Sequence, residues 1–172
     1  MKKRDVFIKG IYRDILKRKD GTITYDSGWA SNTIVDQCRM LLAGFMKNDP
    51  SDGIQYLAVG RGLQVWDTTG APVPNTATTT NLIDRFDPPI QVSDLVIVYL
   101  NYDETTSTTP TTRLQITATL PTNYPTPETY PLREFGLFGR LNGTDFMINN
   151  IRHPVIHKDG SSTLIREIRL SF

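Results

Sequence analysis

Two stretches of the sequence decide the fold: DLVIVYLNY at residues 94–102 and RLQITATL at residues 113–120. The first is a short apolar run. The second alternates between apolar and polar residues and places four apolar side chains on one face: Leu114, Ile116, Ala118 and Leu120. A period of two is typical of a β-strand that buries one face. The segment between them, DETTSTTPTT, is polar and contains a proline, which indicates a hairpin tip.

Further strands are expected on both sides of this hairpin. Residues 54–59, IQYLAV, form a nearly continuous apolar run with the length of a buried strand. Three strand-like stretches occupy the last forty residues, at 132–139, 144–151 and 164–172. Asn-Gly at 142–143 and Asp-Gly at 159–160 fall between them as turn signals.

Two segments are expected to be connections rather than strands. Residues 67–80, DTTGAPVPNTATTT, combine six threonines with two prolines and read as a long loop. Residues 121–131, PTNYPTPETYP, contain four prolines. Because each proline removes a backbone donor from any strand ladder, we expect a stiff, extended connection there.

The beginning of the chain predicts a basic β-hairpin over residues 1–29. Asp20-Gly21 separates two extended segments, and glycine tolerates the positive φ that a tight turn requires. Residues 1–20 carry eight Lys or Arg and three Asp, whereas residues 49–110 carry two Arg, seven Asp and one Glu. We expect these opposite charges either to pair within the fold or between subunits, or to remain a solvated surface.

One helix is predicted over residues 31–48. Ser31, Asn32 or Thr33 is the expected N-cap. Apolar residues then recur at helical spacing: Ile34, Val35, Cys38, Leu41, Leu42 and Phe45. Pro50 ends the pattern, since the residue before a proline disfavours helical backbone. We expect Met40 and Met46, near this stripe, to fill the core.

These elements together predict a mainly β (α+β) fold, an antiparallel β-sandwich or barrel-like domain with one packed α-helix. At 172 residues, the chain has the length of one ordinary domain. We therefore expect a single domain over residues 1–172, in which a β-rich body with long Thr/Pro loops spans residues 54–172.

Composition excludes several classes of protein. Charged residues make up 22% of the chain and the formal net charge is +1, so no global field selects a nucleic acid or an anionic membrane as partner. The single cysteine, Cys38, excludes an internal disulfide and fits folding in a reducing cytoplasm. No signal-peptide pattern or transmembrane-length apolar run is present.

The candidate catalytic and metal-binding motifs are weak. His153 and His157 lie four residues apart, but Pro154 and the β-branched residues between them favour extended backbone, which separates the two imidazoles by about 13 Å. Gly60-Arg61-Gly62 lacks the further glycine and the helix of a phosphate-binding loop and is expected to be a turn. Cys38 lies on the apolar helix stripe, where a thiol behaves as a small hydrophobe. We expect no catalytic residue, metal or cofactor.

Two groups of motifs resemble known proteins in their order and spacing. Residues 54–62, IQYLAVGRG, are followed by the Thr/Pro-rich loop and by Asn81-Leu82-Ile83-Asp84-Arg85. Near the end, residues 134–139 read EFGLFG and residues 146–159 read FMINNIRHPVIHKD. This succession is similar to that of phage tail, baseplate and tail-fibre-associated structural proteins, and of their counterparts in phage-derived contractile injection systems.

The resemblance spans about residues 32–172. Asp84 stands where glutamate is common in these proteins, and the histidine pair and the basic first hairpin are further departures from the pattern. The resemblance implies a non-enzymatic structural subunit at a tail end, collar, baseplate or fibre attachment. Its partners would be copies of itself and other tail or particle proteins, with no small-molecule substrate. Such a protein would be made in the host cytoplasm and reside in the virion tail or injection particle.

Seven residues are the candidates for subunit contacts, because they are basic residues of the hairpin or aromatic residues near expected loops: Arg4, Arg18, Lys19, Trp66, Tyr102, Tyr124 and Tyr130. Two other functions remain open. A carbohydrate-binding β module would use Trp66, Tyr124 and Tyr130 on one exposed face. A small hydrolase would require a pocket that joins a histidine to carboxylates.

Overall fold

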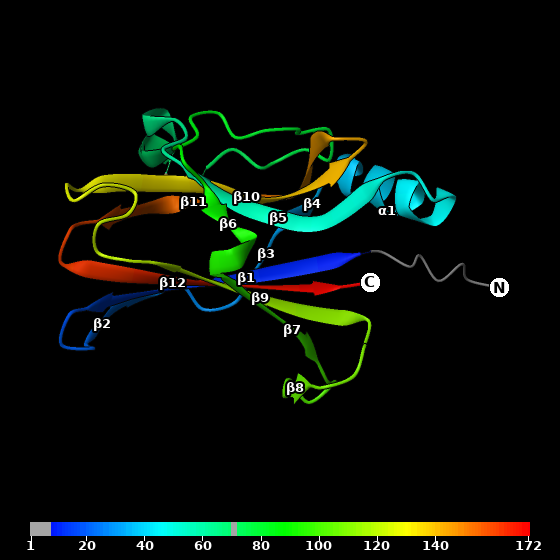
Figure 1. Cartoon of the computed structure of the whole chain (residues 1–172). Helices are drawn as coiled ribbons and strands as arrows, with labels where there is room; N and C mark the ends of the chain where they lie inside the picture. Colours follow the sequence, from blue (N-terminus) through cyan, green and yellow to red (C-terminus); the bar gives the residue numbers. More distant parts are fainter. Residues whose placement is uncertain (1–7, 70–71) are drawn as a thin grey trace.

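The computed structural model describes residues 8–69 and 72–172 and shows two antiparallel sheets packed face to face, with one α-helix at the end of the sandwich (Figure 1). The predicted fold, an antiparallel β-sandwich with one packed helix, is confirmed. Every pair of neighbouring strands in both sheets is antiparallel.

The first sheet has seven strands and contains both the first and the last strand of the chain. Its order is β2 (Ile23–Asp26), β1 (Lys9–Arg18), β12 (Ser162–Ser171), β9 (Arg113–Leu120), β7 (Leu95–Leu100) and β8 (Thr106–Ser107), and β3 (Ala30–Ser31) also pairs with β1. The hairpin predicted from residues 94–120 therefore supplies three strands at one side of this sheet, β9, β7 and β8, with Ile97 opposite Ile116.

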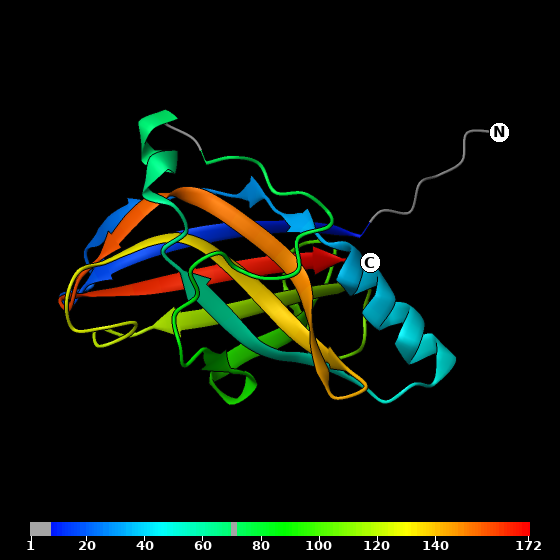
Figure 2. The same cartoon turned by 90° about the horizontal axis from the view of Figure 1, so that it is seen from above.

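The second sheet has five strands and lies above the first in Figure 1. Its order is β4 (Thr33–Ile34), β11 (Thr144–Lys158), β10 (Tyr130–Leu141), β5 (Ser51–Gly60) and β6 (Ile90–Gln91). Seen from above, its long strands cross those of the first sheet, and α1 (Asp36–Lys47) lies beyond one end (Figure 2). Two short 3-10 helices complete the described elements: η1 (Gln64–Thr69) and η2 (Val92–Asp94).

The main core lies between the two sheets. Alternate residues of β12 point inward and are almost fully buried: Ser162, Leu164, Arg166, Ile168 and Leu170. Facing them from the second sheet are Leu132, Phe135 and Leu137 of β10 and Ile151 of β11. The alternation of β12 is strict, although an arginine in one inward position hides it in the sequence.

A second, smaller cluster covers the other face of the five-stranded sheet. Leu82, from the connection between β5 and β6, packs there with Val35, Tyr56, Phe138 and Met147. The buried carboxylate of Glu134 accepts hydrogen bonds from the backbone N–H groups of Ile83 (2.9 Å) and Asp84 (2.8 Å). This carboxylate therefore fixes the loop on the sheet, because it satisfies two backbone donors at once.

The helix begins later than the sequence predicts. It spans Asp36–Lys47, and its N-cap is Val35, which makes no side-chain capping bond, rather than one of the predicted polar residues at 31–33. Those residues are extended instead, since β3 pairs with β1 and β4 pairs with β11. The strand ladders satisfy backbone groups that a longer helix would have used, so tertiary pairing overrides the local capping signal.

The other element boundaries differ less. The helix ends as predicted, with Asn48 in the left-handed region at φ 69 and the N–H of Asp49 bonded to the carbonyl of Gly44. Strand β5 begins at Ser51, before the predicted start at residue 54. Strand β11 continues past residue 151 through both histidines to Lys158, which confirms the extended backbone expected around Pro154.

Candidate functional site

An apolar cleft opens between the two sheets at the end that carries α1. Strand β6 pairs with β5 only at Tyr56 and Leu57, and β8 pairs with β7 only at Tyr99 and Leu100. Gly60, at the end of β5, also forms an isolated antiparallel bridge with Arg85, and within the described residues no further strand pairs with the remaining edges of β5 and β7. The sheets therefore stay open on this side, and the cleft between them has a volume of about 330 Å³.

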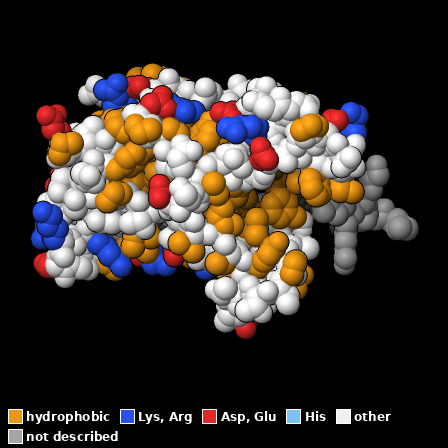
Figure 3. Space-filling view, in the orientation of Figure 1, with side chains coloured by type: hydrophobic (Ala, Val, Ile, Leu, Met, Phe, Trp, Pro, Cys, Tyr) orange, Lys and Arg blue, Asp and Glu red, His pale blue; other side chains and the backbone are white. Residues whose placement is uncertain are grey.

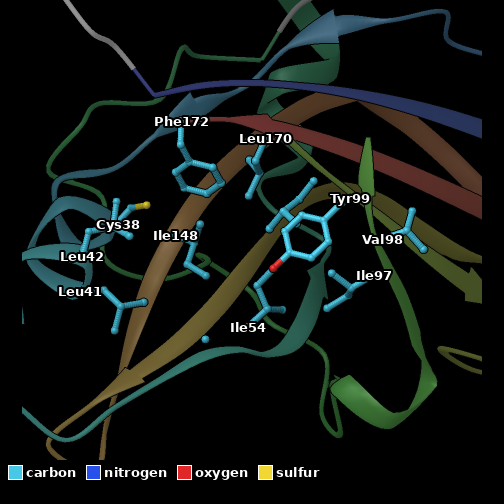
Figure 4. A pocket seen from close by; sticks show the side chains of 12 residues that line it. Cys38, Leu41, Leu42, Ile54, Ile97, Val98, Tyr99, Ile148, Leu170 and Phe172 are labelled. Atoms are coloured by element: carbon cyan, nitrogen blue, oxygen red, sulfur yellow. The ribbon is translucent and has the colours of Figure 1, made fainter. Parts of the chain in front are cut away.

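The lining of the cleft is almost entirely hydrophobic and comes from both sheets, the helix and the C-terminal residue (Figure 4): Cys38, Leu41, Leu42, Gly53, Ile54, Ile97, Val98, Tyr99, Leu114, Ile148, Leu170 and Phe172. The ring of Tyr99 points across the cleft toward Ile54. A hollow of this size lined by aliphatic and aromatic groups is typical of a surface that binds an apolar partner.

The helix extends the apolar surface beyond the cleft. One flank of α1 carries four apolar residues: Cys38, Leu42, Phe45 and Met46. The last three follow Cys38 by four, seven and eight residues, which is the spacing of one helix face. Phe45 is 65% exposed and Met46 81% exposed. Met40, on the opposite flank, is also exposed, so the prediction that the two methionines fill the core is wrong.

The close packing of the helix explains this exposure. α1 lies against the β10–β11 hairpin, and a Cβ atom at Gly44 would come within 2.5 Å of Leu141. Only the face that carries Cys38, Leu41 and Gly44 is buried. The apolar residues on either side of that face remain exposed: Met40 at 54%, Leu42 at 37%, Phe45 at 65% and Met46 at 81%.

We define the apolar patch as five exposed side chains: Leu42, Tyr99 and Phe172, which line the cleft, and Phe45 and Met46, which follow Leu42 by three and four residues on the same flank of the helix. Figure 3 shows hydrophobic side chains gathered on this side of the molecule, around a hollow between the two sheets. Sequence reasoning placed Leu42 and Phe45 on the apolar stripe of the helix and did not select Tyr99 or Phe172. The sequence did contain one sign of an exposed apolar surface: the apolar stripe of the helix is wider than a single packed face requires.

Cys38 is a wall of this cleft and not a reactive thiol. Its side chain is buried, and burial raises the pKa of the thiol to about 11, against a smaller lowering by Arg39. At pH 8 only about one thiol in a thousand is ionised, and the thiolate is the reactive form.

We expect Cys38 in the native protein to react with a thiol reagent at pH 8 at least about a hundredfold more slowly than in the denatured chain. The absorbance of released thionitrobenzoate in a stopped-flow or manual assay measures both rates. The same sample in denaturant is the control. A native rate within about tenfold of the denatured rate would contradict the burial of this thiol.

A second cluster of polar groups lies inside the sandwich and is structural in its geometry. Arg166 donates to both carboxylate oxygens of Asp14, at 2.6 and 3.0 Å, and lies 3.0 Å from Nε2 of His153. Its guanidinium carbon lies 3.6 Å from the ring centroid of Phe135. Asp14 and Arg166 are fully buried and His153 is nearly so, which leaves no room for a substrate beside them.

The two histidines do not form a metal site. His153 is buried beside Arg166, whereas His157 is exposed. Across residues 8–69 and 72–172, no group of three or more histidine, cysteine and carboxylate side chains is arranged to hold a metal ion. Gly60 ends strand β5, and Arg61 and Gly62 follow it without regular structure; Gly62 adopts a φ of 55, and a Cβ atom there would lie 2.3 Å from the ring of Trp66.

The structure does not bring the seven predicted contact residues together. Arg4 lies outside the described residues, and Arg18 and Lys19 are exposed at the β1–β2 turn. Their role in subunit contacts stays a prediction.

Of the four predicted aromatic residues, only Tyr102 is broadly exposed, at 89%. Trp66 is buried under the guanidinium of Arg152, and Tyr130 is buried against Phe86. The hydroxyl of Tyr124 donates to the carbonyl of Pro88 at 2.9 Å. An exposed aromatic face of the kind that a sugar ring stacks on is therefore not formed by Trp66, Tyr124 and Tyr130.

Within the described part of the chain, no helix is long and apolar enough to cross a membrane. Comparisons with protein-family models, with curated proteins and with solved structures found no match to this chain.

Proposed function

We propose that this chain is a non-enzymatic structural subunit of a phage tail or a contractile injection particle, which acts by oligomerising and docking to neighbouring subunits. The observation that carries the proposal is the apolar patch beside the open cleft. Exposed Phe45 and Met46 cost solvation free energy in an isolated chain, and a contiguous apolar surface of this kind marks a contact site. A neighbouring subunit that covers the patch removes that cost.

The packing of the motif segments supports the same proposal. Glu134, from the EFGLFG segment, binds the backbone of Ile83 and Asp84, and Arg61 donates to Asp84 at 2.8 Å. Three segments that are far apart in the sequence therefore form one unit on the outer face of the five-stranded sheet. The residues of the resembling pattern therefore contact one another in the fold, which supports the proposal.

The proposal assigns the chain to an assembled particle, with copies of itself and other particle proteins as partners and with no cofactor. Its test is to purify intact particles from the organism that encodes the chain. Mass spectrometry of the particles should find the chain at a fixed ratio to the other particle proteins, and antibody labelling in electron micrographs should place it at one position. Purified particles that lack the chain would contradict the proposal.

The basic turn between β1 and β2 carries a separate prediction. Arg18→Glu together with Lys19→Glu should weaken assembly into particles at least about tenfold, since a docking contact made by two cations would become repulsive. The melting temperature should stay nearly unchanged, because both side chains are exposed.

Copies of the chain per particle, counted by quantitative mass spectrometry, measure the effect. Asp94→Lys is the control, since it reverses one exposed charge on η2, outside both the β1–β2 turn and the apolar patch. Normal incorporation of the Arg18/Lys19 variant would show that the turn has no docking role.

A further inference from the structure

The apolar patch and the cleft together give one chain both a projecting apolar surface and a hollow that could receive it. The cleft is a hollow, and beside it Phe45 and Met46 project from α1 with large exposed fractions. In a two-fold pair both copies use the same surface. A contact between the projecting residues of one copy and the cleft of the other is therefore made twice, once in each direction. A surface that carries its own complement is suited to a second copy of the same chain.

The size of the patch fits such a pair. A fully exposed Met, Phe or Tyr side chain presents about 200 Å², so the five patch residues together expose roughly 500 Å² of largely apolar surface. A stable interface buries about 800 Å² on each partner, of which roughly 55–65% is apolar. The patch alone therefore supplies the apolar share of one side of a stable dimer.

Charge also permits a second copy. The chain has a formal net charge of +1, so two copies approach without strong long-range repulsion. Charges of both signs adjoin the patch and the cleft in the sequence: Lys47, next to Met46, has a side chain that is 74% exposed and pairs with Asp49, and Asp52, next to the cleft residue Gly53, is exposed. A rim of mixed sign around an apolar centre is the usual composition of a protein interface.

From these observations we propose that the cleft and the adjoining flank of α1 form a two-fold interface between two copies of this chain. Phe45 and Met46 of one copy enter the cleft of the other and cover Tyr99 and Phe172. The inference rests on the proposed function, in that it names the partner of the docking surface, and it is tested independently of the particle.

The test is the mass of the purified chain in solution, measured by light scattering and sedimentation over a range of about 1 to 100 µM. The wild-type chain should be dimeric toward the upper end of this range. Phe45→Glu with Met46→Glu places charges in an apolar contact and should raise the dimer dissociation constant at least about thirtyfold. Met40→Glu, an equally polar change on the opposite flank of the same helix, should leave the dissociation constant within about twofold of the wild-type value.

Circular dichroism confirms that both variants remain folded, since all three positions are exposed. A wild-type chain that stays monomeric overturns the inference, because another subunit must then cover the patch. A dimer that survives the double substitution, or that Met40→Glu dissolves equally, also overturns it. Failure here leaves the proposed function intact if the chain is present in purified particles, whereas absence from particles contradicts the proposed function but not a measured dimer.

Discussion

Replacing Asp14 with alanine should lower the free energy of unfolding by about 3–5 kcal/mol. Asp14 and Arg166 are fully buried, and the carboxylate accepts two hydrogen bonds from the guanidinium. Without Asp14 the Arg166 guanidinium loses its carboxylate partner inside the sandwich, and the His153 ring nitrogen and the face of Phe135 remain beside it. An uncompensated buried charge is among the most destabilising changes in a protein core.

The neighbouring strand positions supply the control for this prediction. Arg13, the next residue along β1, forms an ion pair with Asp26 on the outer face of the same sheet, with Nε at 2.9 Å from the carboxylate. Because that pair is exposed to solvent, Asp26→Ala should lower the free energy of unfolding far less than Asp14→Ala. Denaturant titrations followed by far-ultraviolet circular dichroism give both values. A loss for Asp14→Ala no larger than that for Asp26→Ala would contradict the role of the buried pair.

The second large effect depends on pH. Burial, and then the adjacent positive charge of Arg166, lower the pKa of His153 from 6.5 to about 4, although Asp14 and a hydrogen bond to the carbonyl of Pro154 oppose the shift. The unfolded chain therefore binds a proton at this side chain in a range of pH where the folded chain does not. The effect of His153 on the free energy of unfolding is negligible above pH 6.5, and the protein loses stability through this residue as the pH falls from 6.5 toward 4.

The expected loss from this one histidine is about 2 kcal/mol between pH 7 and pH 5. Unfolding titrations at the two pH values measure it. A His153→Gln variant, which keeps a polar side chain beside Arg166, should lose this difference between the two pH values. His157→Gln removes the exposed histidine of the same strand and should retain the difference. Equal pH dependence in the wild type and the His153 variant would rule out the buried neutral imidazole as its source.

Much of the architecture is readable from the sequence, because local patterns and tertiary packing agree there. The alternation in residues 113–120 is strand β9 without any change of boundary, and Asn142-Gly143 forms the β10–β11 turn with both residues at positive φ. The helix is likewise found by its periodicity. Each of these signals depends on residues that are close in the chain, so neighbouring sequence is sufficient to predict them.

The remainder depends on contacts between distant residues. Arg166 interrupts the apolar pattern of β12, and its partner Asp14 lies 152 positions away, so the buried pair cannot be inferred from either segment alone. The helix starts later than predicted because residues 30–31 and 33–34 pair with strands β1 and β11. The cleft was missed for the same reason, since Phe172, Tyr99 and Leu42 meet only after both sheets and the helix are in place.

The position of β12 has a consequence for synthesis of the chain. This strand lies between β1 and β9 and pairs along its length with both, yet it comprises residues 162–171. During synthesis, the edges of β1 and β9 that pair with β12 have no strand partner until residues 162–171 leave the ribosomal exit tunnel. Because non-local pairing of this kind is slow and leaves hydrophobic surface open, we expect nascent copies to be prone to aggregation until β12 pairs.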